Sequence, residues 1–141
     1  MTIPEQLTYI YHNYEYWHKS KLSVEDSNKY HEILIMQGNI LTYVENDILI
    51  GYVEVWRINY EQLGRILCEE KFFVFDENIT DGNIAYIHNM WIAPEHRMSL
   101  VNKKVLNDFF SKFGDCKYMF LRRVKWNYNF KVYPMKNFVR S

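Results

Sequence analysis

Residues 84–113 constrain the fold of this chain more than any other stretch. Residues 84–92 alternate with a two-residue period and are mostly apolar, which is typical of a buried β-strand. Residues 100–113 repeat apolar side chains every three or four positions, which predicts an amphipathic helix that ends at Gly114. Only a short polar turn around Pro94 separates the two. We therefore predict a central strand that passes directly into a helix, whose first amides lie beside the end of the strand and can bind an anion.

Hydrophobic periodicity also predicts the elements on either side. They are helices over residues 5–18 and 23–37, a hairpin over 40–58, a strand over 117–124 and, over 127–135, a short helix or a helical turn around Pro134. Asn46 and Asp47, which tolerate left-handed backbone, place the turn of the hairpin. Residues 59–67 fit either a helical turn or a loop. Because the sequence contains no repeat or linker, we predict an α/β fold with a mixed sheet, in a single domain over residues 1–141.

Charge and composition exclude several classes of protein. The 17 basic and 17 acidic residues cancel, so no overall field draws the chain to nucleic acid or to an anionic membrane. A basic stretch over residues 117–140 fits an anion-binding tail or a solvated edge. No apolar run is long enough to cross a bilayer, and the first residues do not begin a signal peptide. Two cysteines in unrelated contexts are typical of a reducing compartment, so we expect a cytoplasmic protein without membrane partners.

Residues 92–102 resemble a segment of a known family. The segment is the acyl-CoA-binding turn of the GNAT acetyltransferase superfamily, with the pattern V-x-P-x-x-R-G-x-G-x-G/A before a helix. The residues that match it are Ile92, Pro94 and Arg97. The three glycine positions hold Met98, Leu100 and Asn102. In the family these glycines let backbone amides approach the pyrophosphate. We expect the side chains of Met98 and Leu100 to hinder that approach, both by their bulk and by disfavouring a positive φ.

Two further segments resemble the family in order and separation. Ile50-Gly51-Tyr52 is similar to its I-x-G hairpin. Residues 133–138 are similar to its C-terminal Y-x-x-x-G-F motif, with Asn137 in the glycine place, and asparagine tolerates a positive φ better than most residues. The resemblance implies a GNAT-like fold, with a mixed, mostly antiparallel sheet flanked by helices. It also implies transfer of an acetyl group from acetyl-CoA to an amine, carried by a small molecule or by a protein.

The resemblance assigns roles to particular residues. Those that would hold the acetyl-CoA cosubstrate are Ile92, Arg97, Met98, Ser99, Leu100, Val101, Asn102 and Asn127. Tyr133 would donate a proton to the leaving thiolate. A tyrosine packed against the sheet is the structural alternative for Tyr133, since the chain has 12 tyrosines. Arg97 would contact phosphate or stabilise the turn by its charge.

The strand over residues 84–92 offers a candidate base. Its two-residue period places Tyr86, His88 and Met90 on one face. Histidine is the side chain whose ordinary pKa best suits general-base chemistry near neutral pH, so His88 or a water would accept the amine proton. A packed, non-catalytic histidine is the alternative. Glu54 in the hairpin is the nearest carboxylate candidate, because this strand contains no acid.

We predict no metal site. Glu95 and His96 are adjacent in sequence and so do not face one another. The histidines near the N-terminus also lack the spacing of metal ligands, and we expect them on the surface; they are His12, His18 and His31.

Three hypotheses of function remain. The first is a GNAT-like N-acetyltransferase. The second is a catalytically degenerate GNAT-fold binding or structural protein, of viral or mobile-element origin, that has lost the CoA-binding glycines. Such a protein would contact a protein partner or itself through its aromatic surface, since 18% of the residues are aromatic. The third, nucleic-acid binding through the basic stretch, is the weakest, because the chain has no recognised motif and no net charge.

Overall fold

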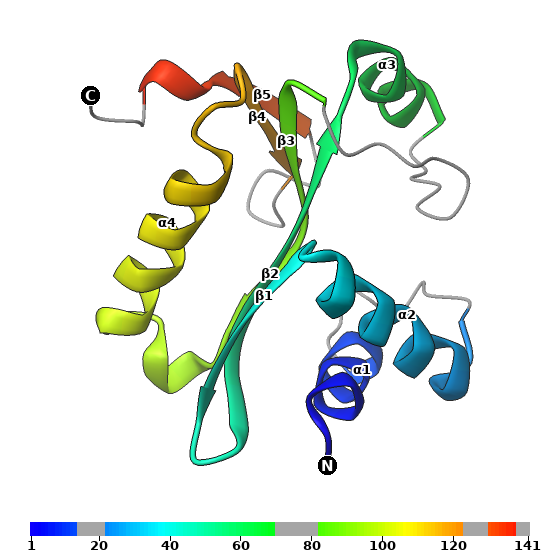
Figure 1. The fold of residues 1–141 in the computed structure, drawn as a ribbon, viewed down its shortest axis with the longest axis vertical. Coiled ribbons are helices and arrows are strands. Elements are labelled where there is room, and N and C mark those ends of the chain that lie inside the picture. Colours follow the sequence, from blue (N-terminus) through cyan, green and yellow to red (C-terminus); the bar gives the residue numbers. More distant parts are fainter. Residues whose placement is uncertain (14–21, 70–81, 123–129, 138–141) are drawn as a thin grey trace. The chain divides into compact units, whose positions relative to one another are not determined.

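The computed structural model describes residues 1–13, 22–69, 82–122 and 130–137 (Figure 1). Its elements in chain order are α1 (Ile3–Asn13), α2 (Val24–Gln37), β1 (Ile40–Glu45), β2 (Ile48–Ile58), α3 (Tyr60–Glu69), β3 (Ile84–Ile92), η2 (Pro94–His96), α4 (Leu100–Phe113), β4 (Tyr118–Arg122), β5 (Phe130–Pro134) and η4 (Met135–Asn137). The five strands form one sheet in the order β1-β2-β3-β4-β5. The pairs β1–β2 and β4–β5 are antiparallel, whereas β3 and β4 are parallel. The predicted α/β class, the mixed sheet and the central place of the strand over 84–92 are confirmed.

Two compact units divide the chain. The first consists of Met1–Glu54 and Met90–Asn102, and the second of Val55–Asn89 and Lys103–Ser141. We describe each by itself. The organisation as a single domain over residues 1–141 stays a prediction.

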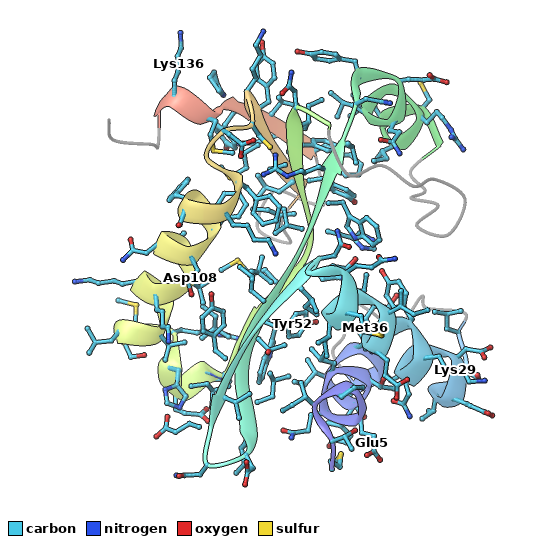
Figure 2. All side chains as sticks on the ribbon, in the orientation of Figure 1. Glu5, Lys29, Met36, Tyr52, Asp108 and Lys136 are labelled. Carbon is cyan, nitrogen blue, oxygen red and sulfur yellow. The ribbon has the colours of Figure 1, made fainter. Side chains whose placement is uncertain are left out.

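In the first unit, the ends of α2 are fixed by local sequence. Ser23 Oγ accepts a hydrogen bond from the backbone N–H of Asp26 at 3.1 Å, which is a helix N-cap. Gly38 follows the helix in the left-handed conformation, with a φ of 74° that glycine adopts without strain. Between these ends, α2 buries Tyr30 and Leu34 and leaves Met36 exposed (Figure 2).

The β1–β2 hairpin is closed by its turn and by α1. Asn46 and Asp47 have φ values of 52° and 64°, as the sequence predicts. The side-chain amide of Gln6 on α1 makes two hydrogen bonds with this end of the hairpin. Its Nε2 donates to Asp47 O at 2.9 Å, and its Oε1 accepts from Leu49 N at 2.8 Å. The N-terminal helix therefore holds this end of the hairpin through the polar contacts of Gln6.

In the second unit, aromatic rings make much of the core. The ring of Phe120 lies 5.0 Å from that of Tyr86 and 4.8 Å from that of Phe130. The side chains that α4 buries are Val105, Phe109 and Phe113. Residues 59–67, ambiguous in the sequence, are largely helical. Asn59 Oδ1 accepts from Gln62 N at 2.8 Å, and Gln62 Oε1 accepts from Asn59 N at 3.0 Å, which is a reciprocal cap at the start of α3.

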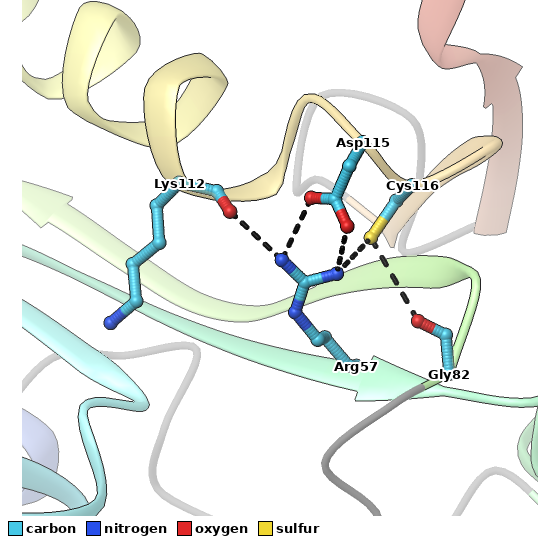
Figure 3. Close-up of polar contacts among 5 residues, drawn as sticks. All are labelled: Arg57, Gly82, Lys112, Asp115 and Cys116. Carbon is cyan, nitrogen blue, oxygen red and sulfur yellow. Dashed lines mark hydrogen bonds and ion pairs between the residues drawn. The ribbon is translucent and has the colours of Figure 1, made fainter.

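Arg57 on β2 connects the end of α4 to the following turn (Figure 3). Its guanidinium donates to both carboxylate oxygens of Asp115, at 2.8 and 2.9 Å, and to the backbone carbonyl of Lys112 at 2.8 Å. The carbonyl is one of those that an α-helix leaves unpaired at its C-terminus. The bidentate hydrogen bond lowers the pKa of Asp115 and raises that of Arg57. Burial raises the pKa of the neighbouring Cys116 thiol, whose Sγ lies 3.2 Å from Arg57 Nη1.

We expect Arg57→Met to lower the free energy of unfolding by about 1–2 kcal/mol, because it removes a charged partner from the C-terminus of α4 and from Asp115. Asp115→Asn is the matched control. Because Asp115 is largely exposed, its loss should cost only about 0.5 kcal/mol. Urea unfolding measures both variants. Equal losses would show that the ion pair, rather than the helix end, is what Arg57 stabilises.

The structure corrects two predictions about these elements. Of the two predictions for residues 127–135, the short helix is wrong, because Phe130–Pro134 is a strand that pairs with β4; the helical turn η4 follows directly after Pro134. The apolar face predicted for residues 100–113 is also too wide. Leu100 is 80% exposed and Leu106 is 45% exposed. Residues 14–18 of the helix predicted over 5–18 lie outside the described residues.

Candidate functional site

The turn after β3 belongs to the first unit and begins where β3 packs closely on β2. Ala93 N donates to Ile50 O at 2.8 Å. A Cβ at Gly51 would lie 3.3 Å from Trp91 O, which is a tight contact, so glycine suits this position of the hairpin. Pro94 is the first residue of η2, a 3-10 helix of one turn. Proline is favoured at a helix start because its missing N–H would have no helical partner. Local packing and helix geometry therefore explain why glycine occupies position 51 and proline position 94.

Arg97 supports the backbone of this turn. Its Nε donates to the carbonyl of Ile92 at 2.9 Å, so the side chain folds back onto the last residue of β3. His96 Nε2 lies 3.9 Å from Glu45 Oε2, near the end of the β1–β2 hairpin. Arg97 was expected either to contact phosphate or to stabilise the turn, and its hydrogen bond with Ile92 corresponds to the second role.

Several backbone amides at the start of α4 are already hydrogen-bonded within the turn. Arg97 N donates to Pro94 O at 3.4 Å, and Ser99 N donates to His96 O at 3.2 Å. Val101 N donates to Ser99 Oγ at 3.3 Å, and Asn102 N to Ser99 O at 3.2 Å. A pyrophosphate at this helix start would have to replace such bonds. A serine directly before a helical pattern is an N-cap signal that sequence reasoning could have used.

Met98 and Leu100 are not strained. Met98 is 99% exposed and Leu100 is 80% exposed. Within the described residues, a positive φ occurs at Asn46, Asp47 and Gly38, and at neither of these two positions. The expectation that a positive φ at Met98 or Leu100 would be costly therefore does not apply. Hindrance by side-chain bulk stays a prediction, and it is weakened because both side chains extend into solvent.

The second unit contains a parallel strand pair, β3 and β4. β3 and β4 are in register at Ile84–Tyr118, Ala85–Met119 and Tyr86–Phe120. Both strands continue beyond these residues, to Ile92 in β3 and to Arg122 in β4. Ligands of α/β sheets bind at the carboxyl ends of parallel strands. We call this region the β3–β4 opening.

His88 lies at the β3–β4 opening. It stands two residues beyond Tyr86, which is in register with Phe120 of β4. The ring centroids of Tyr86 and His88 are 5.4 Å apart, so the predicted shared face is confirmed. Tyr86 is buried and packs on Phe120, whereas His88 is half-buried. The imidazole is thus held by a core ring and remains partly accessible.

Tyr133 lies on the other face of the sheet. Directly paired residues of a sheet project to the same side, and Tyr133 pairs with Met119, which pairs with Ala85. Tyr86 and His88 project to the opposite side, with Phe120. Ala85 and Met119 are also the second residues of β3 and β4, so Tyr133 is level with the amino ends of the parallel strands. The register therefore does not bring Tyr133 and His88 together.

The remaining candidates lie elsewhere. Glu54 is 1% exposed in the first unit and accepts a hydrogen bond from the Tyr30 hydroxyl at 2.8 Å. Asn127 lies outside the described residues. His31 is 2% exposed, so the expectation of a surface position is wrong for it. Within the described ranges, no group of three potential metal ligands comes together, and no helix is long and apolar enough to cross a membrane.

Comparison with known proteins identifies the fold. No protein-family profile matches the sequence, and no curated protein matches it significantly. The loading GNATL domain of CurA from Lyngbya majuscula is similar in structure, with a TM-score of 0.54 and 14% identity over 92% of this chain and 66% of that one. The ribosomal-protein-alanine N-acetyltransferase from Brucella melitensis has a TM-score of 0.49 and 10% identity over 84% of this chain and 65% of that one. This chain thus spans just under two thirds of the length of either structure. The similarity to the CurA domain confirms that the chain has a GNAT fold.

Proposed function

We propose that this protein is an N-acetyltransferase that transfers the acetyl group of acetyl-CoA to an amine. The observation that carries the proposal is the β3–β4 opening, where His88 stands just beyond the paired residues Tyr86 and Phe120 of two parallel strands in a GNAT-type sheet. The family resemblance assigns the phosphates to the turn over residues 92–102 of the first unit. The acceptor would be a small-molecule amine or a protein amine, in the cytoplasm.

The residues at the opening supply a route for protons. The amine nitrogen attacks the thioester carbonyl carbon, and the His88 imidazole accepts the proton that the nitrogen loses. The carbon–sulfur bond then breaks, and the electron pair leaves with the CoA thiolate. His88 can return the proton to that thiolate directly or through water. Tyr133 is the weaker candidate for this donor, because it lies on the other face of the sheet.

A second function is favoured by the turn itself. Its amides are partly hydrogen-bonded to its own carbonyl and hydroxyl groups, and Met98 and Leu100 expose apolar surface where the family pattern has glycine. Such a turn suits a GNAT-fold protein that no longer binds acetyl-CoA and instead contacts a protein partner or a second copy of itself.

Thermal unfolding with acetyl-CoA separates the two functions. We expect the wild-type protein to bind acetyl-CoA, and ligand at a hundredfold its dissociation constant should add about 2.7 kcal/mol to the stability of the folded protein. The absence of any shift at millimolar ligand would contradict the enzyme and favour the binding protein.

The double variant Met98→Gly, Leu100→Gly tests hindrance by bulk. If the exposed side chains move aside, affinity for acetyl-CoA should change by less than about tenfold, or 1.4 kcal/mol. If they block the phosphates, binding should appear only in the variant. Leu106→Gly is the matched control, because it places glycine in the same helix at another exposed leucine and carries a similar helix-propensity cost of about 1 kcal/mol.

A further inference from the structure

Two helices of the first unit are joined by a reciprocal pair of hydroxyl–imidazole contacts. Thr8 Oγ1 on α1 lies 2.9 Å from His31 Nδ1 on α2. Ser27 Oγ on α2 lies 2.9 Å from His12 Nε2 on α1. Each helix therefore contributes one hydroxyl and one histidine, four residues apart on a single face. We call these four residues the α1–α2 clasp.

The α1–α2 clasp is largely excluded from water. Thr8, Ser27 and His31 have exposed fractions of 2%, 0% and 2%. The rings of Tyr11 and Tyr30 lie 5.8 and 5.4 Å from that of His31. The imidazole of His31 is hydrogen-bonded to its hydroxyl partner, and a hydrogen bond with the backbone of Ser27 raises its pKa and so favours its charged form. A protonated imidazole would place a full charge among buried groups, which is costly unless a counter-charge is near.

The described groups that face His31 only partly offset that cost. From β2, the carboxylate of Glu54 favours the charged imidazole, but it lies in a hydrogen bond with Tyr30. From α1, His12 disfavours a second positive charge, and the ring of Tyr11 contacts the imidazole edge-on. Burial is the largest effect and lowers the pKa of His31 to about 4. Apolar side chains in place of Thr8 and His31 could fill the space between the helices without any response to pH. Histidine, by contrast, is the side chain that ordinarily titrates between pH 5 and 8.

We propose that the α1–α2 clasp is a proton-sensitive lock, which holds the two helices together at neutral pH and releases them in mild acid. The direction of the pH dependence follows from the linkage between protonation of His31 and opening of the helix pair. An opened helix pair exposes His31, which then takes up a proton near its ordinary pKa of 6.5. The stabilisation is complete above pH 6.5 and is lost as the pH falls from 6.5 towards 4.

Hydrogen exchange of the full chain tests the lock. Between pH 7 and pH 5, after correction for the intrinsic exchange rate, we expect opening of α1 and α2 to increase about twentyfold, the ratio that these two pKa values give. The helix α4 serves as the internal reference. His31→Gln keeps a polar, neutral side chain, and the increase should then fall below about threefold. His96→Gln, which removes a histidine from the turn after β3, is the matched control and should retain the full increase.

Two outcomes would overturn the lock. One is an equal response of α1, α2 and α4 to acid in the wild-type protein. The other is a twentyfold increase that persists in His31→Gln. If that variant does not fold, the ring signals of His31 in wild-type NMR spectra decide the question. If these signals titrate with a midpoint below pH 5, the lock is supported. A titration midpoint at or above pH 6.5 contradicts it.

Discussion

Gly82→Ala is expected to destabilise the second unit by about 3 kcal/mol or more, because overpacking against backbone cannot be relieved by a rotamer change. A Cβ at Gly82 would lie 2.7 Å from Ile58 N and closer still to the carbonyl group of Ile58. These atoms belong to the last residue of β2, so the strand itself would have to move. Urea or thermal unfolding measures the loss, and failure to obtain folded protein is the extreme form of the same result.

Gly64→Ala is the control for this substitution. Gly64 lies within α3, and a Cβ there would meet no atom within 4 Å. Because alanine is the better helix former, this variant should gain about 0.5–1 kcal/mol. A loss at Gly64 similar to that at Gly82 would show that the clash with Ile58 is not the cause.

His88→Gln is expected to lower kcat/KM for acetyl transfer by about a hundredfold or more, if the protein is the proposed enzyme. Glutamine keeps a polar side chain of similar length but cannot accept the amine proton at neutral pH. Release of free CoA, followed with a thiol reagent across a panel of amines, is a suitable assay. The fall should appear in kcat, because proton transfer belongs to the chemical step.

Tyr133→Phe distinguishes the sheet register from the family resemblance. The resemblance makes Tyr133 the proton donor to the thiolate, and its loss would then slow turnover strongly. The register places Tyr133 on the face opposite His88, level with the amino ends of β3 and β4. We therefore expect turnover to change by less than about threefold. A large fall in this variant, with His88→Gln unaffected, would reverse the assignment.

Local sequence was sufficient for much of the fold. The change from a two-residue to a 3.6-residue period across Pro94 gives β3 and α4 with their observed bounds. Asn46 and Asp47 give the hairpin turn because their left-handed preference is a property of single residues. Ser23 begins α2 through its side-chain N-cap, and Gly38 ends it in the left-handed conformation. Both are also properties of single residues. Each of these signals acts within a few residues along the chain.

What could not be predicted depends on contacts between distant segments. β5 is a strand because it pairs with β4, and its own short sequence does not determine this. The face on which Tyr133 lies follows from the same pairing. Arg97 was ambiguous because the carbonyl that it contacts, that of Ile92, becomes its neighbour only when the turn forms. The burial of His31 was missed, although the spacing of Thr8 to His12 recurs between Ser27 and His31.

The order of the strands also bears on aggregation. Among the described strands, β1 and β5 are the outer ones, and an outer strand is a template on which another chain can add a strand. β5 has two features that oppose such addition: it is only five residues long and ends at Pro134, which has no N–H to donate, and it carries an exposed lysine, Lys131. On β1, the bulge between Tyr43 and Val44 interrupts the regular ladder. The sequences of β1 and β5 therefore both oppose the addition of a strand from another chain.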